Sequence, residues 1–234
     1  MNADSRRPAR PHICANFAIT ADGKISTRRF TPALFTSLAD KARLQEIRAA
    51  ADAVMAGAGT VAADTMSLGL SRHDLREARA AKGLPPVPLR VVLSNSGRLD
   101  PEWKVFCYAE SPLVLFSTRR MPQGRRDRIA PRCDLHLFSG KTVPLEAALG
   151  ILAGDYGIRR LVCEGGGTLL RSLAEADLVD EFHVTIAPKI FGGAAAPTIA
   201  GLPGGFLPAA REFRIIGHRT AGDECFLHLR RIAA

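Results

Sequence analysis

The residues of this sequence best placed to bind a ligand are an acid and three glycines that follow a short apolar run. Glu164 ends the run Leu161–Cys163, and apolar residues then recur at helical spacing. Glycines in such a turn let a ligand approach the backbone, and free N–H groups at a helix N-terminus bind anions. The pattern predicts a dinucleotide pyrophosphate site, although its spacing is not G-x-G-x-x-G and a plain tight turn would look the same. The residues expected to contact the nucleotide here are Gly165, Gly166, Gly167, Thr168 and Leu169.

A second strand, glycine and helix pattern lies at residues 53–64. Thr60 suits either a helix N-cap or a hydroxyl that faces a phosphate, and Asp64 falls on the same helix face one turn later. Both side chains are therefore candidate ligand contacts.

Two further apolar runs also end in polar residues. One is followed by Ser94 and Asn95, and the other, Leu113–Phe116, by a polar stretch that contains Arg119 and Arg120. Guanidinium groups are well suited to hold a ribose phosphate. Together with the two glycine turns, these strand ends predict one edge of a parallel sheet.

The elements that must position these residues alternate along the chain. We predict strands at 13–19, 53–57, 89–94, 113–117, 134–138, 160–164 and 182–187, helices at 38–50, from 60, at 144–155 and at 167–176, and a C-terminal hairpin of 211–216 and 225–230. Ser37 and Asp40 give the helix at 38–50 a start like a capping box, and Leu38, Leu44 and Ile47 give it an apolar face. This order predicts an α/β fold with a mostly parallel central sheet flanked by helices and antiparallel C-terminal strands.

Composition agrees with one folded domain. Hydrophobic residues make up 47% of the chain and the mean hydropathy is +0.04. We expect residues 1–11 to form a disordered basic arm and residues 12–234 a single domain, with neither a secretory signal nor a membrane span. The five cysteines are widely spaced and contain no C-x-x-C, which predicts buried free thiols in a reducing cytoplasm.

The net charge of +9 allows two interpretations. A basic surface could bind nucleic acid, but the densest arginine cluster, at 119–132, has no interleaved aromatic residues on which bases could stack. Steering of phosphorylated small molecules explains the charge with fewer assumptions. We therefore expect a phosphorylated small-molecule substrate and no nucleic-acid or membrane partner. Motifs for metal hydrolysis, serine hydrolysis and phosphoryl transfer are absent from the sequence.

The order of motifs resembles the dihydrofolate reductase superfamily, and most closely its riboflavin-pathway pyrimidine reductase branch. The matching segments fall within residues 12–231 and are Asn16–Ile25, Ile47–Ala49, Asp52–Val54, Gly57–Asp64, Arg90–Asn95, Glu164–Gly166, Leu178–Phe182 and Ala187–Gly193. The resemblance implies a dihydrofolate-reductase-like fold and the reduction of a ribosylaminopyrimidine phosphate to its ribitylamino product, with NADPH as hydride donor.

Residue by residue, the resemblance implies cofactor contacts at Ala18, Thr60, Asp64 and Asn95 and after the glycine turn, to which the strand-end reasoning adds Ser94 and Arg119. It implies substrate contacts at Asn16, Arg48, Leu68 and Glu164. By residue type alone, Arg48 would be a solvated helix charge and Leu68 a core residue. No residue is assigned as the proton donor.

The sequence departs from the bacterial bifunctional enzymes of this branch. It lacks the H-x-E and P-C-x-x-C motifs of a zinc deaminase, so we expect reduction only. Asn16 stands where many bacterial enzymes have lysine, as in archaeal-type stand-alone reductases. The loop at 27–36 lacks the family's Gly-Glu-Ser and Trp, and Ser71 replaces an expected arginine.

Three functions remain open at this level. The first is the pyrimidine reductase, and the second is a reductase of the same fold acting on another substrate such as a dihydropteridine. Asp40 is the acid that could engage a pteridine from the first helix, but its predicted capping role accounts for it. The third is a basic nucleic-acid-binding module.

Two further predictions concern the cofactor and the assembly. No acid stands among Ser94, Asn95, Arg119 and Arg120 to accept a ribose 2′-hydroxyl, so we predict NADPH over NADH. Members of this branch typically pair, and we expect a homodimer with an interface drawn largely from the C-terminal third, where predicted strands carry Phe182, Phe213 and Phe226.

Overall fold

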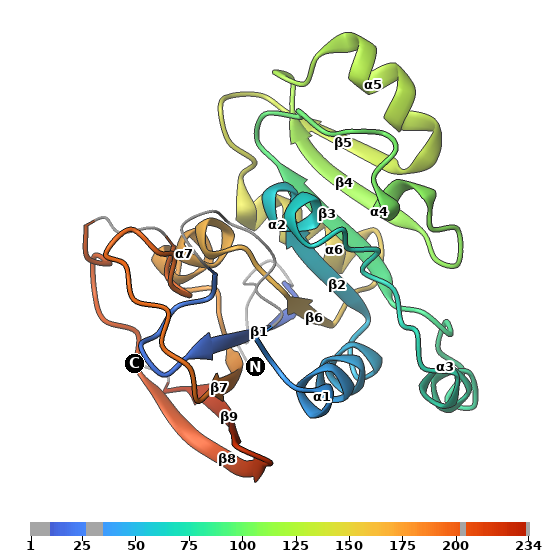
Figure 1. The fold of residues 1–234 in the computed structure, drawn as a ribbon. Helices are drawn as coiled ribbons and strands as arrows, with labels where there is room; N and C mark the ends of the chain where they lie inside the picture. Colours follow the sequence, from blue (N-terminus) through green and yellow to red (C-terminus); the bar gives the residue numbers. More distant parts are fainter. Residues whose placement is uncertain (1–9, 27–34, 202–204, 233–234) are drawn as a thin grey trace, which may run out of the picture.

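The computed structural model describes residues 10–26, 35–201 and 205–232. A nine-stranded sheet with the order β5-β4-β3-β2-β6-β1-β7-β9-β8 forms its centre (Figure 1). The strands are β1 (His12–Thr20), β2 (Ala53–Gly57), β3 (Leu89–Ser94), β4 (Leu113–Thr118), β5 (Asp134–Phe138), β6 (Arg160–Cys163), β7 (Glu181–Ala187), β8 (Phe213–Ala221) and β9 (Glu224–Arg231). The helices are α1 (Leu38–Ala49), α2 (Ala58–Ala63), α3 (His73–Ala80), α4 (Lys104–Cys107), α5 (Gln123–Ile129), α6 (Leu145–Gly154) and α7 (Gly167–Glu175), with a 3₁₀ turn at Ala130–Arg132.

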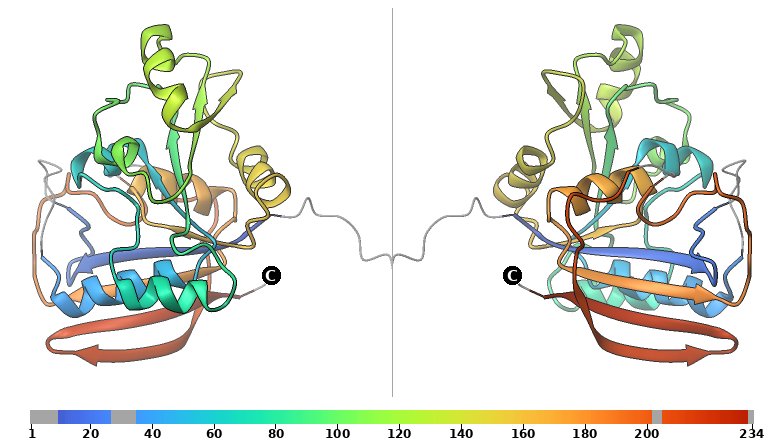
Figure 2. Two further views of the ribbon diagram at one scale, coloured as in Figure 1. Left: turned by 90° about the vertical axis from the view of Figure 1, so that its right-hand side faces the viewer. Right: turned by 90° about the vertical axis from the view of Figure 1, so that its left-hand side faces the viewer.

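The predicted fold class is confirmed. Strands β1 to β7 pair in parallel, and β8 and β9 add an antiparallel hairpin at one edge. Alternate residues of the central strands face opposite sides, since Ala53 and Met55 of β2 join the core beneath α6 and α7 while Val54 and Ala56 join the core beneath α2, α4 and α5. The side views in Figure 2 show helices on both faces of the sheet.

The path of the chain creates a natural ligand position. Strands β2 to β5 step outward from the centre, and the chain then returns to insert β6 between β2 and β1. In open α/β sheets, ligands bind outside the carboxyl ends of the strands where the strand order reverses. The glycine turns after β2 and β6 lie at this reversal.

The sequence does not predict helices α3, α4 and α5, which are short and bury few apolar side chains. α3 is instead held by arginines: Arg79 donates to the carbonyl oxygens of Ala49, Ala51 and Pro85, at 2.8, 2.6 and 2.8 Å. Such long-range side-chain to backbone bonds leave no periodic pattern in the sequence.

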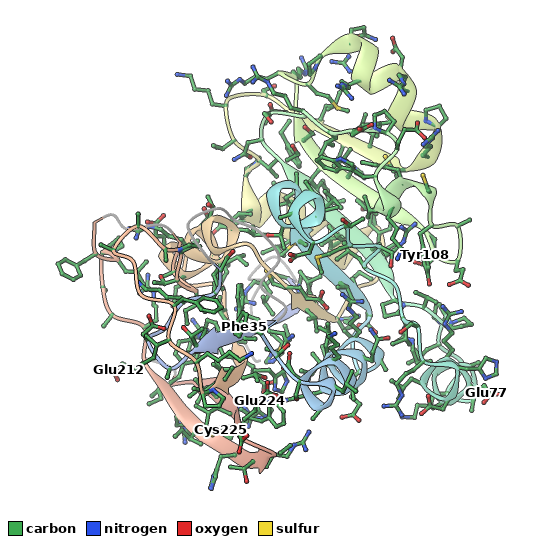
Figure 3. The ribbon with its side chains drawn as sticks, in the orientation of Figure 1. Phe35, Glu77, Tyr108, Glu212, Glu224 and Cys225 are labelled. Atoms are coloured by element: carbon green, nitrogen blue, oxygen red, sulfur yellow. The ribbon has the colours of Figure 1, made fainter. Side chains whose placement is uncertain are left out.

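The capping box predicted at the start of α1 is only partly present. Ser37 does cap the helix by accepting from the N–H groups of Ala39 and Asp40, but the Asp40 carboxylate does not close a capping box. The N–H of Ser37 donates instead to Glu224 of β9 (labelled in Figure 3) at 2.7 Å. Leu38 is also not part of an apolar face, since it is 81% exposed.

The five cysteines are free, as predicted, but only Cys14 and Cys163 are fully buried. Cys107 is exposed and the other two are half-buried, so the prediction of uniform burial was wrong. No helix among the described residues is long and apolar enough to cross a membrane.

The predicted basic arm falls mostly on residues 1–9, which lie outside the described residues. Arg10 is described, and it forms a bidentate ion pair with Asp180 at 2.6 and 2.8 Å.

Candidate active site

A cavity of ≈ 740 Å³ opens at the carboxyl ends of β1, β2 and β6. One wall, called here the nucleotide wall, consists of Gly57, Gly59, Thr60, Ala63, Asp64 and Gly166, Gly167, Thr168 and Leu169. The facing α1 wall consists of Asp40, Lys41, Leu44 and Arg48, with Glu164 beside it. Asn16, Phe17 and Ala18 of β1 form the floor, and Phe35 (labelled in Figure 3) also lines the cavity.

The glycine turn after β6 packs closely against α2. Gly165 has φ +113°, a conformation that favours glycine, and its carbonyl oxygen accepts from the N–H of Gly57 at 2.7 Å. A Cβ on Gly166 would lie 2.5 Å from Thr60 Oγ1. The turn therefore brings the backbone to the surface of the cavity with no side chain in front of it.

Gly167 is glycine for a different reason. It is the first residue of α7, and a Cβ there would lie 2.7 Å from the carbonyl oxygen of Thr198 and 2.8 Å from Gly201 Cα. This glycine allows the 198–201 loop to pack on α7. The first N–H groups of α7 lack intrahelical partners and carry the positive end of the helix dipole, so this end of the cavity suits an anion.

Thr60 and Asp64 share one face of α2, as predicted, and both line the cavity. The N-cap interpretation of Thr60 is wrong, because Gly57 is the N-cap residue and Thr60 lies within the helix. Asp64 is exposed to solvent at the rim, yet the surrounding protein removes part of its hydration and raises the pKa of its carboxyl group.

A buried ion pair joins α1 to the end of β6. Arg48 Nε and Nη2 each donate to one oxygen of Glu164 at 2.6 Å, and Arg48 Nη1 donates to the carbonyl oxygen of Gly69 at 2.6 Å. Burial acts to lower the pKa of Arg48, but the charge and hydrogen bonds of Glu164 outweigh it and the pKa is raised. Arg48 is thus neither a solvated helix charge nor an uncompensated cation.

The two residues of the ion pair still have hydrogen-bonding capacity. A guanidinium has five N–H donors, and Arg48 uses three of them on protein groups. Both side chains line the cavity, where the remaining N–H groups and carboxylate lone pairs can meet a polar ligand.

The α1 wall also contains a carboxylate whose environment sequence analysis did not anticipate. Asp40 Oδ1 accepts from Thr185 Oγ1 of β7 at 2.6 Å, and Arg43 Nη1 donates to the same hydroxyl at 3.1 Å. The residues are more than 140 positions apart in the sequence. The alternation of β7 is the only sequence signal that could have placed Thr185 on the face toward α1.

Several predicted site residues do not line this cavity. Leu68 is fully buried in the core, with a left-handed backbone at φ +58°. Ser94 Oγ accepts from the N–H of Gly97, and Asn95 Oδ1 accepts from the N–H of Val143, so both organise loops at the end of β3. Arg119 is exposed beyond the end of β4.

These strand ends nevertheless continue the edge on which the cavity opens. Gly57 of β2 is opposite Leu93 of β3, and Ser94 is opposite Ser117 of β4. With strands about 4.8 Å apart, the end of β4 lies roughly 10 Å from the end of β2. An elongated ligand that begins at the glycine turn can reach it.

The region of the expected 27–36 loop is described only from residue 35 onward. Ser71 does not line the cavity. Its N–H and hydroxyl both donate to Gln45 Oε1, at 2.7 and 3.0 Å. Arg72 pairs with Asp74 and Glu46 on the outer surface.

A mostly parallel sheet with a glycine turn, an open helix N-terminus and a large cavity at its carboxyl edge defines an α/β enzyme of the nucleotide-binding type. The family model described as the RibD C-terminal domain matches residues 11–226, and the chain belongs to this family. The predicted family and the oxidoreductase class are confirmed.

Two archaeal relatives share the name 2,5-diamino-6-ribosylamino-4(3H)-pyrimidinone 5′-phosphate reductase. The protein of Archaeoglobus fulgidus is 35% identical over 81% of this chain and 86% of its own length. That of Methanothermobacter thermautotrophicus is 37% identical over 81% and 83%.

The fold is shared with solved structures. A pyrimidine reductase-like protein of Corynebacterium diphtheriae superposes with a TM-score of 0.84 at 19% identity, covering 96% of this chain and 93% of that one. The RibD protein of Acinetobacter baumannii gives a TM-score of 0.77 at 22% identity, and there the match covers 59% of the longer chain.

Proposed function

We propose that this protein is an NADPH-dependent reductase that acts in riboflavin biosynthesis. Its substrate is 2,5-diamino-6-ribosylamino-4(3H)-pyrimidinone 5′-phosphate or the corresponding 5-amino-uracil, and its product is the ribitylamino compound. The observation that carries the proposal is the cavity with two unlike walls, one suited to a dinucleotide and the other to a polar substrate. The names of the archaeal relatives support the substrate class.

The nucleotide wall fits the cofactor. Gly166 lines the cavity and has no side chain, so a ligand can approach its backbone closely. Gly165 shapes the turn. The pyrophosphate would be held by the N–H groups of Gly166, Gly167, Thr168 and Leu169. The nicotinamide half of the cofactor would be contacted by Ala18, Thr60 and Asp64. When bound, reduced nicotinamide supplies a hydride.

The outer half of the cofactor would extend over the ends of β3 and β4. Ser94, Asn95 and Arg119 lie there, and no acid stands among them to bind an unmodified ribose 2′-hydroxyl. The exposed guanidinium of Arg119 is a suitable partner for a 2′-phosphate. These features support NADPH over NADH.

The substrate would bind between the two walls. The sugar carbon gains a hydride as its bond to the ring oxygen breaks, and that oxygen must receive a proton. Arg48 and Glu164 would bind the polar sugar phosphate portion, and Asn16 on the floor would contact the heterocycle. Leu68 would act indirectly, because its left-handed backbone positions the loop whose Gly69 carbonyl holds Arg48.

A thermal-shift titration with NADPH and NADH tests the cofactor assignment. A ligand that binds only the folded state at 100 times its Kd stabilises it by about 2.7 kcal/mol. We expect a clear shift with NADPH and a smaller one with NADH at equal concentration. No shift with either nucleotide would contradict the proposal and leave the basic surface as a nucleic-acid-binding module.

We also propose that the protein is a homodimer in the cytoplasm. Phe182 packs edge-to-face on Phe213 at 5.0 Å and Phe226 is buried, so these aromatics complete the monomer. β8, by contrast, ends the sheet and exposes Ile215 (62%) and Ile216 (38%), and a second copy would cover this edge. Light scattering should give twice the chain mass of 25.1 kDa, and a monomer at micromolar concentration would contradict the dimer. Five free thiols agree with a reducing compartment.

A further inference from the structure

A loop beside the Arg48–Glu164 ion pair, residues 67–70, is held by its carbonyl oxygens. Three arginines from three elements each donate to one of them: Arg48 of α1 to Gly69 at 2.6 Å, Arg90 of β3 to Ser67 at 3.4 Å, and Arg76 of α3 to Leu70. A guanidinium that is held by a carbonyl oxygen moves when that oxygen moves. The position of the Gly69 peptide therefore helps to fix where Arg48 presents its remaining N–H groups to the cavity.

Tyr108 follows α4 and occupies the space in which a side chain at position 69 would lie (labelled in Figure 3). A Cβ on Gly69 would be 2.5 Å from the ring carbon Cζ and 2.6 Å from the hydroxyl oxygen. The backbone of Gly69 is not left-handed, so its conformation does not require glycine. The close approach of the tyrosine ring is what requires a glycine at this position.

Tyr108 is itself fixed in three ways. Arg90 Nη2 donates to its carbonyl oxygen at 2.7 Å, and the Arg90 guanidinium lies over the ring, 5.0 Å from the centroid. Arg76 Nη2 donates to its hydroxyl oxygen at 3.1 Å, and Arg76 also pairs with Glu110. Burial lowers the pKa of Arg90 to about 10, which still leaves it charged at neutral pH. The ring is therefore held at its backbone, its face and its hydroxyl, and it can act as a firm support for the Gly69 peptide.

We propose that Tyr108 is a positioning residue for substrate binding, which acts on Arg48 through the peptide of Gly69. This inference rests on the proposed function, in which Arg48 binds the sugar phosphate portion of the substrate. Tyr108 does not line the cavity, so it acts only through the groups that it contacts. The groups proposed to hold the cofactor belong to the nucleotide wall, which faces Arg48 across the cavity. Loss of Tyr108 should therefore weaken substrate binding and leave NADPH binding largely unchanged.

The expected effect is a change in the KM of the substrate. Arg48 would bind a part of the substrate that does not react, so its contact should be equally strong in the ground state and in the transition state. Weakening such a contact raises KM and leaves kcat nearly unchanged. Loss of a hydrogen bond to a charged group corresponds to a factor of about ten or more. In Tyr108→Ala we expect KM for the pyrimidine ribosyl phosphate to rise about tenfold, with kcat and the NADPH affinity within about twofold of the wild type.

A double-mutant cycle tests the contact between the ring and the peptide. Gly69→Ala places a methyl group against the ring, displaces the peptide and should raise KM about as much as Tyr108→Ala does. In the Tyr108→Ala background the ring is gone, so adding Gly69→Ala should have little further effect on KM. Tyr108→Phe keeps the ring and loses only the bond from Arg76, so its KM should stay near that of the wild type. If Tyr108→Ala does not fold, Tyr108→Leu takes its place, because its shorter side chain also leaves room for the methyl group.

The control is Tyr156→Ala. The chain has two tyrosines, and Tyr156 is half-buried like Tyr108. It bonds to Asp134 and His136 and does not line the cavity. Its loss should lower the melting temperature and leave the KM of the substrate unchanged. Melting temperatures and NADPH titrations of all variants separate a loss of folding from a displaced Arg48.

Each outcome has a definite meaning. A rise in KM in Tyr108→Ala and Gly69→Ala at unchanged NADPH affinity, with no rise in Tyr156→Ala, supports the inference. Unchanged KM in the first two variants, a parallel loss of NADPH affinity, or an equal rise in Tyr156→Ala overturns it while the proposed function stands. Additive effects in the double variant also overturn it, because the two residues would then act independently. Turnover of neither pyrimidine substrate by wild-type protein that binds NADPH overturns the proposed function itself, and the inference with it.

Discussion

The nucleotide wall of the cavity consists largely of backbone and small side chains, whereas the α1 wall carries charged side chains, of which Arg48 is buried together with its partner Glu164. In the first, Gly166 and the start of α7 present N–H groups, and a run of glycines marks this turn in the local sequence. In the second, Arg48 meets Glu164 across 116 positions and Asp40 meets Thr185 across 145. The two walls should therefore respond differently to mutation, with the α1 wall coupled to stability and the nucleotide wall to ligand affinity.

The largest effect is expected at the buried ion pair. Arg48→Ala would leave the Glu164 carboxylate buried without its partner, because their side chains are only 8% and 3% exposed. Loss of one partner of a buried pair lowers the free energy of unfolding by about 3–5 kcal/mol. Urea denaturation measures this loss. Arg72→Ala, which removes an exposed pair with Asp74, is the control and should have little effect. Equal stability of the two variants would show that the ion pair does not hold the wall together.

The glycine turn offers a comparison within three residues. In Gly167→Ala the new methyl would collide with the backbone of Thr198 and Gly201, and such overpacking costs about 1–3 kcal/mol of stability. In Gly166→Ala it would meet only the Thr60 side chain, which can move. We expect Gly166→Ala to lose NADPH affinity with a smaller change in melting temperature.

The partner change at Thr60 sharpens this result. Combining Gly166→Ala with Thr60→Ala relieves the collision and should restore the melting temperature to that of Thr60→Ala alone, while NADPH affinity stays below that of Thr60→Ala alone. Recovery of both properties together would mean that the turn matters only for packing.

A smaller effect is expected at the outer end of the nucleotide wall. Replacing Arg119 and Arg120 together by alanine removes two exposed cations near the end of β4, and the NADPH to NADH affinity ratio should fall roughly tenfold. Titrations of both nucleotides measure the ratio, with Arg214→Ala on β8 as a control of equal charge change per residue. A constant ratio would place the 2′-phosphate elsewhere.

The smallest effect concerns the pH dependence of stability at Asp64. Its pKa is raised above 3.8 because the surrounding protein removes part of its hydration, so the folded protein binds this proton more tightly than the unfolded chain does. The stabilisation of the folded state by this proton is therefore fully present below pH 3.8. It is lost as the pH rises through the pKa that Asp64 has in the folded protein. At neutral pH, Asp64→Asn should therefore melt slightly higher than wild type, and the difference should disappear below pH 3.8. A lower melting temperature of the variant at neutral pH would contradict this sign.

The contrast between the walls also explains what the sequence could predict. The succession of strands along the chain, their mostly parallel pairing and the glycine turns follow from local apolar runs and glycines, and all of them are found in the structure. The role of Asp40 was misread as capping, because its true partner Thr185 lies on β7 and no local pattern connects them. Helix α3 was missed for a related reason, since Arg79 holds it through carbonyl oxygens of distant residues.

Site residues divide in the same way. Thr60 and Asp64 could be paired by helical spacing, and both line the cavity. Helical spacing could not predict the partners of Ser94 and Asn95. Their side chains accept hydrogen bonds from the N–H groups of Gly97 and Val143. Their relation to a bound cofactor stays a prediction.

The most direct test of the central claim is turnover by the purified protein with the 2,5-diamino-pyrimidinone ribosyl phosphate and NADPH. Loss of NADPH absorbance and the mass of the product are followed together. The account predicts that one ribitylamino product forms for each NADPH oxidised, and that NADH supports a lower rate. Tight binding of NADPH without oxidation in the presence of either pyrimidine substrate would contradict it, and would assign the cavity to another substrate.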